Sequence, residues 1–167
     1  KFSNGPEFPG ARGSLTAISN GHVSRGVRLT YDFSQGGSYV SMYRSVSNIA
    51  TSGPLAFWVR ADVRSRITLR LADSNGQTVQ YDMGRPLECI ASGEWCQIVW
   101  RSDTAARDHW GGANDGKLQG TLTSIGIILP KAADAPLSGT VDIDDLAAFD
   151  ASANCVLDPK APGAALG

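Results

Sequence analysis

Residues Arg66–Met83 read RITLRLADSNGQTVQYDM. In the first half of this stretch, Ile67, Leu69 and Leu71 alternate with polar residues, and a period of two is typical of a half-buried strand. The Asn75-Gly76 pair that follows is a hairpin signal, because these residues adopt the positive φ angles of tight turns. The stretch therefore predicts two antiparallel strands joined by a short turn.

The same short-strand pattern recurs along the chain, and no convincing amphipathic helix is present. The 19 glycines and eight prolines divide the chain into short segments, which is typical of antiparallel sandwiches and barrels. The other candidate strands are residues 26–33, 37–46, 55–63, 95–102, 123–131 and 139–149. We therefore predict an all-β protein with one antiparallel β-sandwich in residues 1–150.

Composition narrows the classes of partner. The 167 residues carry a net charge of -1, so there is no basic field for nucleic acid. No apolar run approaches the roughly 20 residues of a membrane helix, and we expect neither a nucleic-acid nor a membrane partner. Because the sequence starts at Lys1 without Met, we expect a mature or excised, secreted or periplasmic module. Residues 151–167, rich in Ala, Pro and Gly, are predicted to be a tail or linker.

Three cysteines are present, at positions 89, 96 and 155. Cys89 and Cys96 flank a Ser-Gly turn signal, so they can face each other across a hairpin and form a disulfide. Two reduced thiols are the alternative, because sequence alone does not establish connectivity. No Cys/His cluster suggests zinc or iron.

The sequence lacks the usual signs of catalysis. His22 and His109 are the only histidines, and no Gly-x-Ser-x-Gly nucleophile elbow is present. The acidic residues do not suggest the acid and base pair of a glycosidase. A small β-sandwich hydrolase or lyase is therefore the least favoured interpretation, and we predict that the chain is not an enzyme.

Acidic residues cluster near the end of the last predicted strand. Asp142 and Asp144 fall on one face of that strand, and Asp145 follows. Like charges this close repel unless a positive group lies beside them. Calcium is one candidate, because it takes six to eight oxygen ligands, with Glu7 brought close if the first and last strands are neighbours. Solvation is the alternative, as is pairing with an arginine from the set Arg12, Arg25 and Arg28.

Four segments together resemble a known family. They are Asn4–Leu15 (NGPEFPGARGSL), Leu69–Gln80 (LRLADSNGQTVQ), His109–Gly120 (HWGGANDGKLQG) and Gly139–Phe149 (GTVDIDDLAAF). In this order they resemble the galactose-binding-like jelly-roll domains appended to bacterial polysaccharide-degrading enzymes, which are carbohydrate-binding modules.

The resemblance implies a structural calcium and a sugar site. The calcium would be held by Glu7, Asp144 and Asp145, with backbone carbonyls near Asn20–Arg25 completing the shell. Which of the two aspartates is a ligand stays open. The sugar would lie on the concave sheet or at loops along one edge.

The glycine-rich stretch after His109 supplies the residue types that sugar recognition needs. Pyranose rings stack on aromatic rings and their hydroxyls bind planar polar groups. We expect Trp110 to be the platform, with His109, Asn114, Asp115 and Lys117 as hydrogen-bonding neighbours. The alternative is that Trp110 plugs one end of the sandwich and that the polar residues form an ordinary turn.

A second polar set lies in the predicted strands. Arg70 faces away from its apolar neighbours, Arg60 shares a face with Trp58, and Gln80 lies in the next strand. If these strands are neighbours, the four side chains line a groove on the concave sheet. The alternative is a solvated outer face. Weaker candidates are Tyr43 and Arg44, and the tryptophans expected in the core are Trp95 and Trp100.

These observations favour non-catalytic binding of a polysaccharide or oligosaccharide. Such a module would target a covalently linked glycoside-active enzyme to its substrate. The alternative from another functional class is a structural accessory domain of a glycoside hydrolase that has no ligand of its own.

Overall fold

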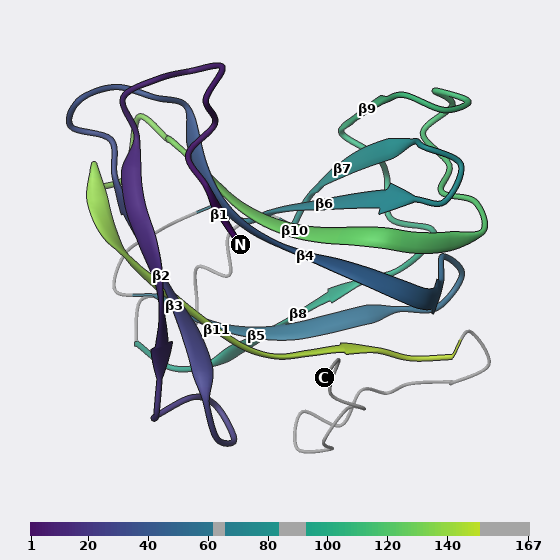
Figure 1. Ribbon diagram of the computed structural model, residues 1–167. Coiled ribbons are helices and arrows are strands. Elements are labelled where there is room, and N and C mark those ends of the chain that lie inside the picture. Colours follow the sequence, from purple (N-terminus) through teal and green to yellow (C-terminus); the bar gives the residue numbers. More distant parts are fainter. Residues whose placement is uncertain (62–65, 84–92, 151–167) are drawn as a thin grey trace.

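The computed structural model describes residues 1–61, 66–83 and 93–150, and within them it consists of strands without a helix. Two antiparallel sheets face each other (Figure 1). The six-stranded sheet has the order β1 (Phe2–Ser3), β4 (Tyr39–Ala50), β10 (Thr121–Pro130), β6 (Thr68–Asp73), β7 (Thr78–Asp82) and β9 (Asp108–Trp110). The five-stranded sheet has the order β2 (Arg12–Ile18), β3 (Gly26–Asp32), β11 (Ser138–Ala148), β5 (Leu55–Ala61) and β8 (Cys96–Trp100). The predicted antiparallel sandwich is confirmed.

Every candidate strand is present, and the hairpin of β6 and β7 forms as predicted, with Gly76 at a φ of 82°. Three strands were not predicted. Two of them, β1 and β9, have only two and three residues. The third, β2, has seven residues but is mostly exposed, because it pairs only with β3 at the edge of its sheet. An edge strand with no buried face leaves no periodic apolar signal.

The core lies between the two sheets. Leu69, Leu71 and Ile67 are at most 1% exposed, and the alternating Leu55 and Phe57 of β5 meet them from the other sheet. Trp100 lies in the core, as predicted, and is the largest fully buried side chain among the described residues. Trp95 is only partly buried, with the Arg60 guanidinium 4.6 Å from the centre of its ring. The core prediction for Trp95 is therefore wrong.

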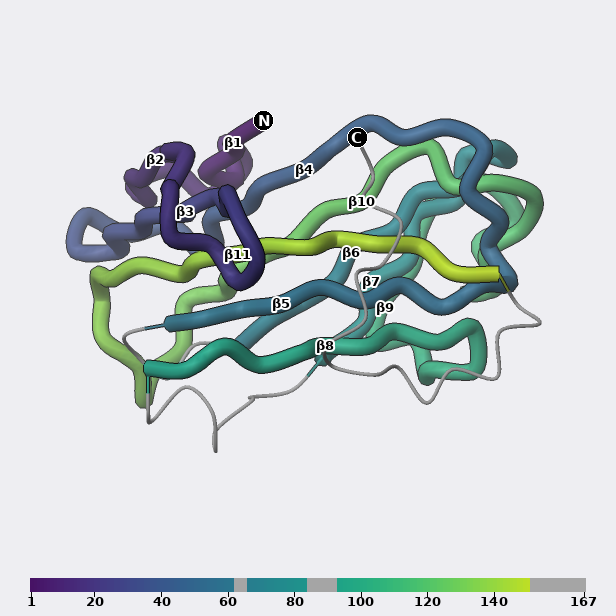
Figure 2. Tube along the Cα trace, turned by 90° about the horizontal axis from the view of Figure 1, so that it is seen from below, coloured from purple at the N-terminus to yellow at the C-terminus, as the bar shows by residue number. Residues whose placement is uncertain are grey.

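The outer face of the six-stranded sheet is concave. Its strands bend, and β9 with its following loop rises at one end while the segment between β1 and β2 rises at the other (Figure 1). Figure 2 shows the opposite side, where β11 lies between β3 and β5 with β8 beyond. The segments that rise at its two ends therefore bound the concave face of the six-stranded sheet.

Two predictions reach residues outside the described ranges. Cys96 is disulfide-bonded, but its expected partner Cys89 lies outside those ranges, as does Cys155. The tail at 151–167 lies outside them as well. Across the described ranges, no helix is long and apolar enough to cross a membrane.

Candidate functional site

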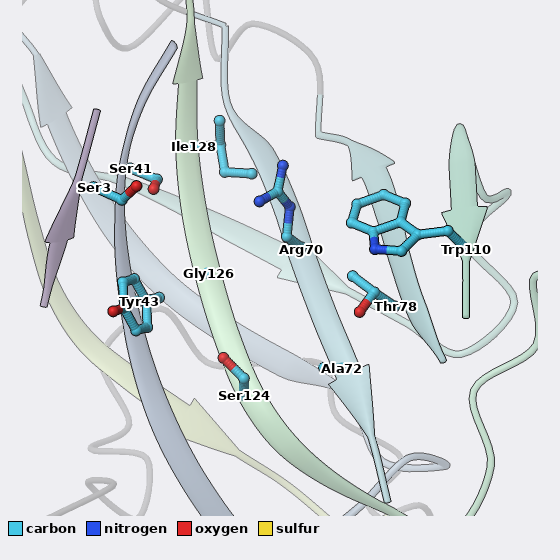
Figure 3. Close-up of a pocket in the computed structure, with 10 residues that line it drawn as sticks. All are labelled: Ser3, Ser41, Tyr43, Arg70, Ala72, Thr78, Trp110, Ser124, Gly126 and Ile128. Atoms are coloured by element: carbon cyan, nitrogen blue, oxygen red, sulfur yellow. The ribbon is translucent and has the colours of Figure 1, made fainter. Parts of the chain in front are cut away.

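Two adjoining hollows of about 280 and 420 Å³ lie on the concave face. They share Arg70, Trp110 and Ile128, so they form one depression, which we call the concave groove. The combined size falls in the range typical of ligand sites. The groove crosses the sheet from β4 to β9 (Figure 3).

Small residues make the floor of the groove low. Gly126 in β10 lies between Tyr43 of β4 and Arg70 of β6 in the strand register. Because Gly126 has no side chain, and its neighbours Ser124 and Ala72 are small, the space above β10 and β6 stays open. A glycine within a strand is typical of a place where another group approaches the backbone closely.

Two aromatic rings stand at the ends of this floor. Tyr43 rises from β4 and is 36% exposed, whereas Trp110 projects from β9 over the sheet and is 41% exposed (Figure 3). Large exposed aromatic rings on a concave surface are typical of a binding site, since their apolar faces gain from contact with a ligand. The predicted Trp110 platform therefore lies in the groove and does not plug the core.

Arg70 occupies the middle of the groove in a fixed position. Its Nε and one terminal nitrogen donate to Gln80 Oε1 at 3.2 and 3.0 Å. The guanidinium carbon lies 5.2 Å from the centre of the Trp110 ring and 5.4 Å from that of Tyr39, which are cation–π distances. The predicted neighbours Arg70 and Gln80 are therefore brought together in the groove, with Trp110 beside them.

In the second hollow of the groove, the Tyr39 hydroxyl donates to Glu7 Oε1. This hydrogen bond is the main reason that the pKa of Glu7 is below its usual value. Burial raises the pKa of Tyr39, and its bond to Glu7 acts in the same direction. Both groups therefore keep their ordinary charge states at neutral pH, with Glu7 ionised and Tyr39 neutral.

The polar residues predicted around Trp110 do not line the concave groove, and several of them bond within the loop instead. His109 alternates with Asp108 and Trp110, so it lies on the other face of β9, and its Nδ1 is 2.8 Å from Asn114 Oδ1. Asp115 Oδ1 accepts bonds from Gln77 and from the backbone N–H of Lys117. Neither hollow of the concave groove is lined by His109, Asn114, Asp115 or Lys117.

Arg60 and Trp58 do not belong to the concave groove, and this prediction is wrong. Both are in β5, which pairs with β11 and β8 in the five-stranded sheet. Arg60 donates to Asp142 at 2.8 Å, and the His22 ring stacks on Trp58 with centroids 3.8 Å apart. Alternation correctly placed Arg60 and Trp58 on one face, but it does not say to which sheet a strand belongs.

The proposed grouping of Glu7 with Asp144 and Asp145 is also wrong. Glu7 lines the concave groove, because β1 pairs with β4 and not with the last strand. Asp144 Oδ2 accepts the backbone N–H of His22 at 2.7 Å, and Asp145 Oδ2 is 2.9 Å from His22 Nδ1. Within residues 1–61, 66–83 and 93–150, no three His, Cys, Asp or Glu side chains gather as metal ligands.

A further hollow of about 450 Å³ lies between the sheets near Asp144. Its walls are mainly core-facing apolar side chains, among them Met42, Ile125, Ile127 and Ile143. Unlike the concave groove, it contains no tryptophan or tyrosine ring. We therefore place the candidate site in the concave groove.

Solved structures with the same fold include carbohydrate-binding modules. The family 11 carbohydrate-binding module from Clostridium thermocellum, solved in complex with a β-1,3-1,4-mixed-linked tetrasaccharide, is 17% identical with a TM-score of 0.61. The match covers 87% of this chain and 84% of that one. The family 11 module of a cellulosomal cellulase of Clostridium thermocellum is 16% identical, with a TM-score of 0.61 and 87% and 83% covered. The chain has the jelly-roll fold of carbohydrate-binding modules.

A domain of a larger enzyme is similar as well. The match to an exo-β-agarase has 19% identity and a TM-score of 0.55, and it covers 85% of this chain but 23% of that one. No protein-family profile and no curated protein sequence matches the chain. The resemblance seen in the sequence is therefore confirmed for the fold.

Several groove residues were missed or undervalued from the sequence. Tyr39, Ser41 and Tyr43 alternate along β4 and so share one face of that strand, and this face lines the groove. The interrupting glycine of β10, Gly126, is a second signal that could have been used. Nothing in the sequence indicated that Glu7 would lie beside Tyr39, since this contact spans 32 positions.

Proposed function

We propose that the chain is a non-catalytic module that binds a single chain of a polysaccharide or oligosaccharide in the concave groove. The observation that carries this proposal is the pair of exposed rings, Tyr43 and Trp110, at the ends of a floor of small side chains. The rings suit the apolar faces of pyranose units. Hydroxyls and amides along the groove suit the sugar hydroxyls, and they are contributed by Ser3, Ser41, Thr78, Gln80 and Ser124.

The charges of the groove favour a neutral glycan. Two basic and two acidic side chains line it, namely Arg70, Arg107, Glu7 and Asp108. The Arg70 guanidinium is held by Gln80, and the Glu7 carboxylate accepts the Tyr39 hydroxyl. An acidic polysaccharide would therefore meet no net positive field here.

A structural accessory role without a ligand is the competing proposal. A domain that serves only to pack against a neighbour needs no hollow, and a filled concave face would be expected of it. The open groove with Trp110 41% exposed supports binding instead.

We also propose that the module serves a linked polysaccharide-degrading enzyme outside the cytoplasm. In the exo-β-agarase, the similar domain accounts for 23% of the chain, which supports an accessory position. The disulfide at Cys96 supports an oxidising compartment. Attachment would raise the local substrate concentration for the enzyme.

The set of residues proposed to bind calcium is smaller than the set predicted from the sequence. Asp144 and Asp145 are adjacent carboxylates beside the loop Asn20–Arg25, and carboxylate and carbonyl oxygens are the ligands calcium prefers. The two carboxylates have suitable chemistry, and calcium would replace the His22 and Val23 N–H groups that Asp144 Oδ2 accepts. Glu7 has no part in this pair. We propose that calcium at this pair would tie the loop to β11 and stabilise the fold.

Titration of the full chain with a glycan panel tests the binding role. The panel contains mixed-linked β-1,3-1,4-glucan and agarose oligosaccharides as neutral chains, and polygalacturonate as an acidic one. We expect binding to a neutral member, and Trp110→Ala to weaken it at least tenfold, which is about 1.4 kcal/mol.

The matched control is Trp58→Ala, which removes the same ring from the opposite face of the sandwich. Trp58→Ala should leave the affinity unchanged. If both variants bind as the unmodified protein does, or if no panel member binds the folded protein, the concave groove is not a glycan site.

A further inference from the structure

A single buried amide organises the loop that follows Trp110. Gln77, directly before β7, is 1% exposed, yet its side chain is polar. Its Oε1 accepts the backbone N–H groups of Asp115 at 2.8 Å and Gly116 at 3.0 Å. Its Nε2 donates to Asp115 Oδ1 at 3.1 Å and to the Lys117 carbonyl at 2.7 Å. Both acceptor sites and both donor sites of the amide are therefore used.

A second buried side chain holds Gln77 in place. Asp73, which is 3% exposed, ends β6. Its Oδ1 accepts the backbone N–H groups of Asn75 and Gln77, at 2.9 and 3.0 Å. Its Oδ2 accepts that of Gln119 at 2.9 Å. The hairpin turn and the loop at residues 111–120 are thus joined by one continuous hydrogen-bond network, which specifies one loop conformation.

The backbone of the loop packs directly on the hairpin turn. A Cβ at Gly111 would lie 2.5 Å from the Gly76 carbonyl oxygen, and one at Gly112 would lie 2.8 Å from the Gln77 nitrogen. The φ angles of these glycines, 72° and 49°, also disfavour a side chain. The two glycines after Trp110 therefore serve this close approach.

This network fixes the loop that follows Trp110. The strand that carries the ring, β9, has three exposed residues and pairs only with β7. A strand this short is weak on its own. The Trp110 ring also lies 5.2 Å from the guanidinium carbon of Arg70. The loop fixed by Gln77 leaves β9 directly at Trp110, so it sets where the strand ends and where the ring projects.

We propose that Gln77 is a positioning residue that preorganises Trp110 for glycan binding; this inference rests on the proposed function of the groove. Gln77 is too deeply buried to touch a ligand itself. Its effect is to remove the cost of ordering β9 and its loop when the glycan binds, and preorganisation of this kind raises affinity.

A double-mutant cycle tests this role with the panel glycan that the unmodified full chain binds most tightly. We expect Gln77→Ala to weaken binding about tenfold, but less than twofold in the Trp110→Ala background, because Gln77 acts through Trp110. Gln97→Ala, on the five-stranded sheet, is the matched control and should not change affinity. Equal losses in the two backgrounds, or full affinity of Gln77→Ala, would overturn the assignment.

Two further measurements keep the test independent of global folding and of the proposed function. If Gln77→Ala does not fold, Gln77→Met fills the same space without hydrogen bonds and should give the same cycle. Amide exchange of Asp115 and Gly116 should be slow in the unmodified protein and fast in the variant, with a shift of the Trp110 indole resonance. If no panel glycan binds, the proposed function fails, whereas unchanged exchange and an unmoved indole resonance refute the positioning role itself.

Discussion

Asp142 shows how one buried carboxylate is accommodated in this sandwich. Its side chain is 4% exposed and accepts bonds from Arg28 at 2.6 and 2.9 Å and from Arg60 at 2.8 Å. The sequence analysis weighed calcium against pairing with an arginine for this acidic cluster, and for Asp142 the pairing with Arg28 is confirmed. The role of Arg60 was not predictable, because its strand reaches β11 only in the folded sheet.

Removing the charge of Asp142 should destabilise the fold. In Asp142→Asn, two guanidinium groups lose a charged partner whose own side chain is only 4% exposed. Hydrogen bonds to charged groups contribute about 1.5–3 kcal/mol, and the arginines are partly exposed, so we expect a loss of about 2 kcal/mol in the free energy of unfolding. Urea denaturation at neutral pH measures it.

The control for Asp142→Asn is Asp103→Asn, at an exposed position between β8 and β9. This variant should unfold within about 0.5 kcal/mol of the unmodified protein. Equal stability of the two variants would show that the Asp142 network contributes nothing.

At the scale of elements, sequence patterns identify strands better than they identify sheets. The alternation of Leu69 and Leu71 sets the buried face of β6, and the Asn75-Gly76 signal sets its turn. Membership of a sheet depends instead on pairings between distant segments, which no local pattern encodes. The groove was therefore assigned correctly for Arg70 and Gln80, which are joined by a hairpin, and wrongly for Arg60.

The polar loop after β9 shows a related limit. Asn114 and Asp115 have the chemistry of sugar ligands and equally that of turn residues. The deciding residue is Gln77, 38 positions away, whose buried amide binds Asp115. In the sequence, Gln77 is only a polar residue at the start of a predicted strand, and nothing there indicates this contact.

A substitution at Gly126 in β10 tests directly whether the groove binds glycan. A Cβ at this position would meet its nearest neighbours, the Cβ and carbonyl oxygen of Arg70, at 3.5 Å, which is an ordinary contact. Gly126→Val should therefore fold, with equal or slightly greater stability, because valine favours strands. Its side chain would fill the floor between Tyr43 and Arg70, so we expect glycan affinity to fall at least tenfold.

Titration calorimetry and thermal unfolding of Gly126→Val measure these two effects separately. Thr16→Val, at an exposed position of β2 in the other sheet, controls for the added valine and should keep full affinity. Normal glycan binding by a folded Gly126→Val protein would place the site elsewhere.

At the scale of the whole molecule, the first and last strands of the described residues belong to different sheets. β1 pairs with β4 in the six-stranded sheet, whereas β11 lies inside the five-stranded one. Glu7 is therefore drawn to the groove and the Asp144–Asp145 pair to the loop at His22. The expectation that first and last strands are neighbours fails here because this topology is fixed by long-range pairing.

Calcium is tested on the whole fold, since an ion at Asp144 and Asp145 would bind only the native state. At a calcium concentration about 100 times the dissociation constant, the stabilisation is about 2.7 kcal/mol, or roughly 5–11 °C in melting temperature for a domain of this size. Chelation should reverse this stabilisation.

Asp145→Asn should abolish the response to calcium while keeping the backbone, because asparagine tolerates the φ of 49° at this position. Glu7→Gln, in the concave groove, should respond to calcium as the unmodified protein does. Melting curves that are identical with calcium and with chelator would refute the ion, and a response lost in Glu7→Gln but kept in Asp145→Asn would place it away from β11.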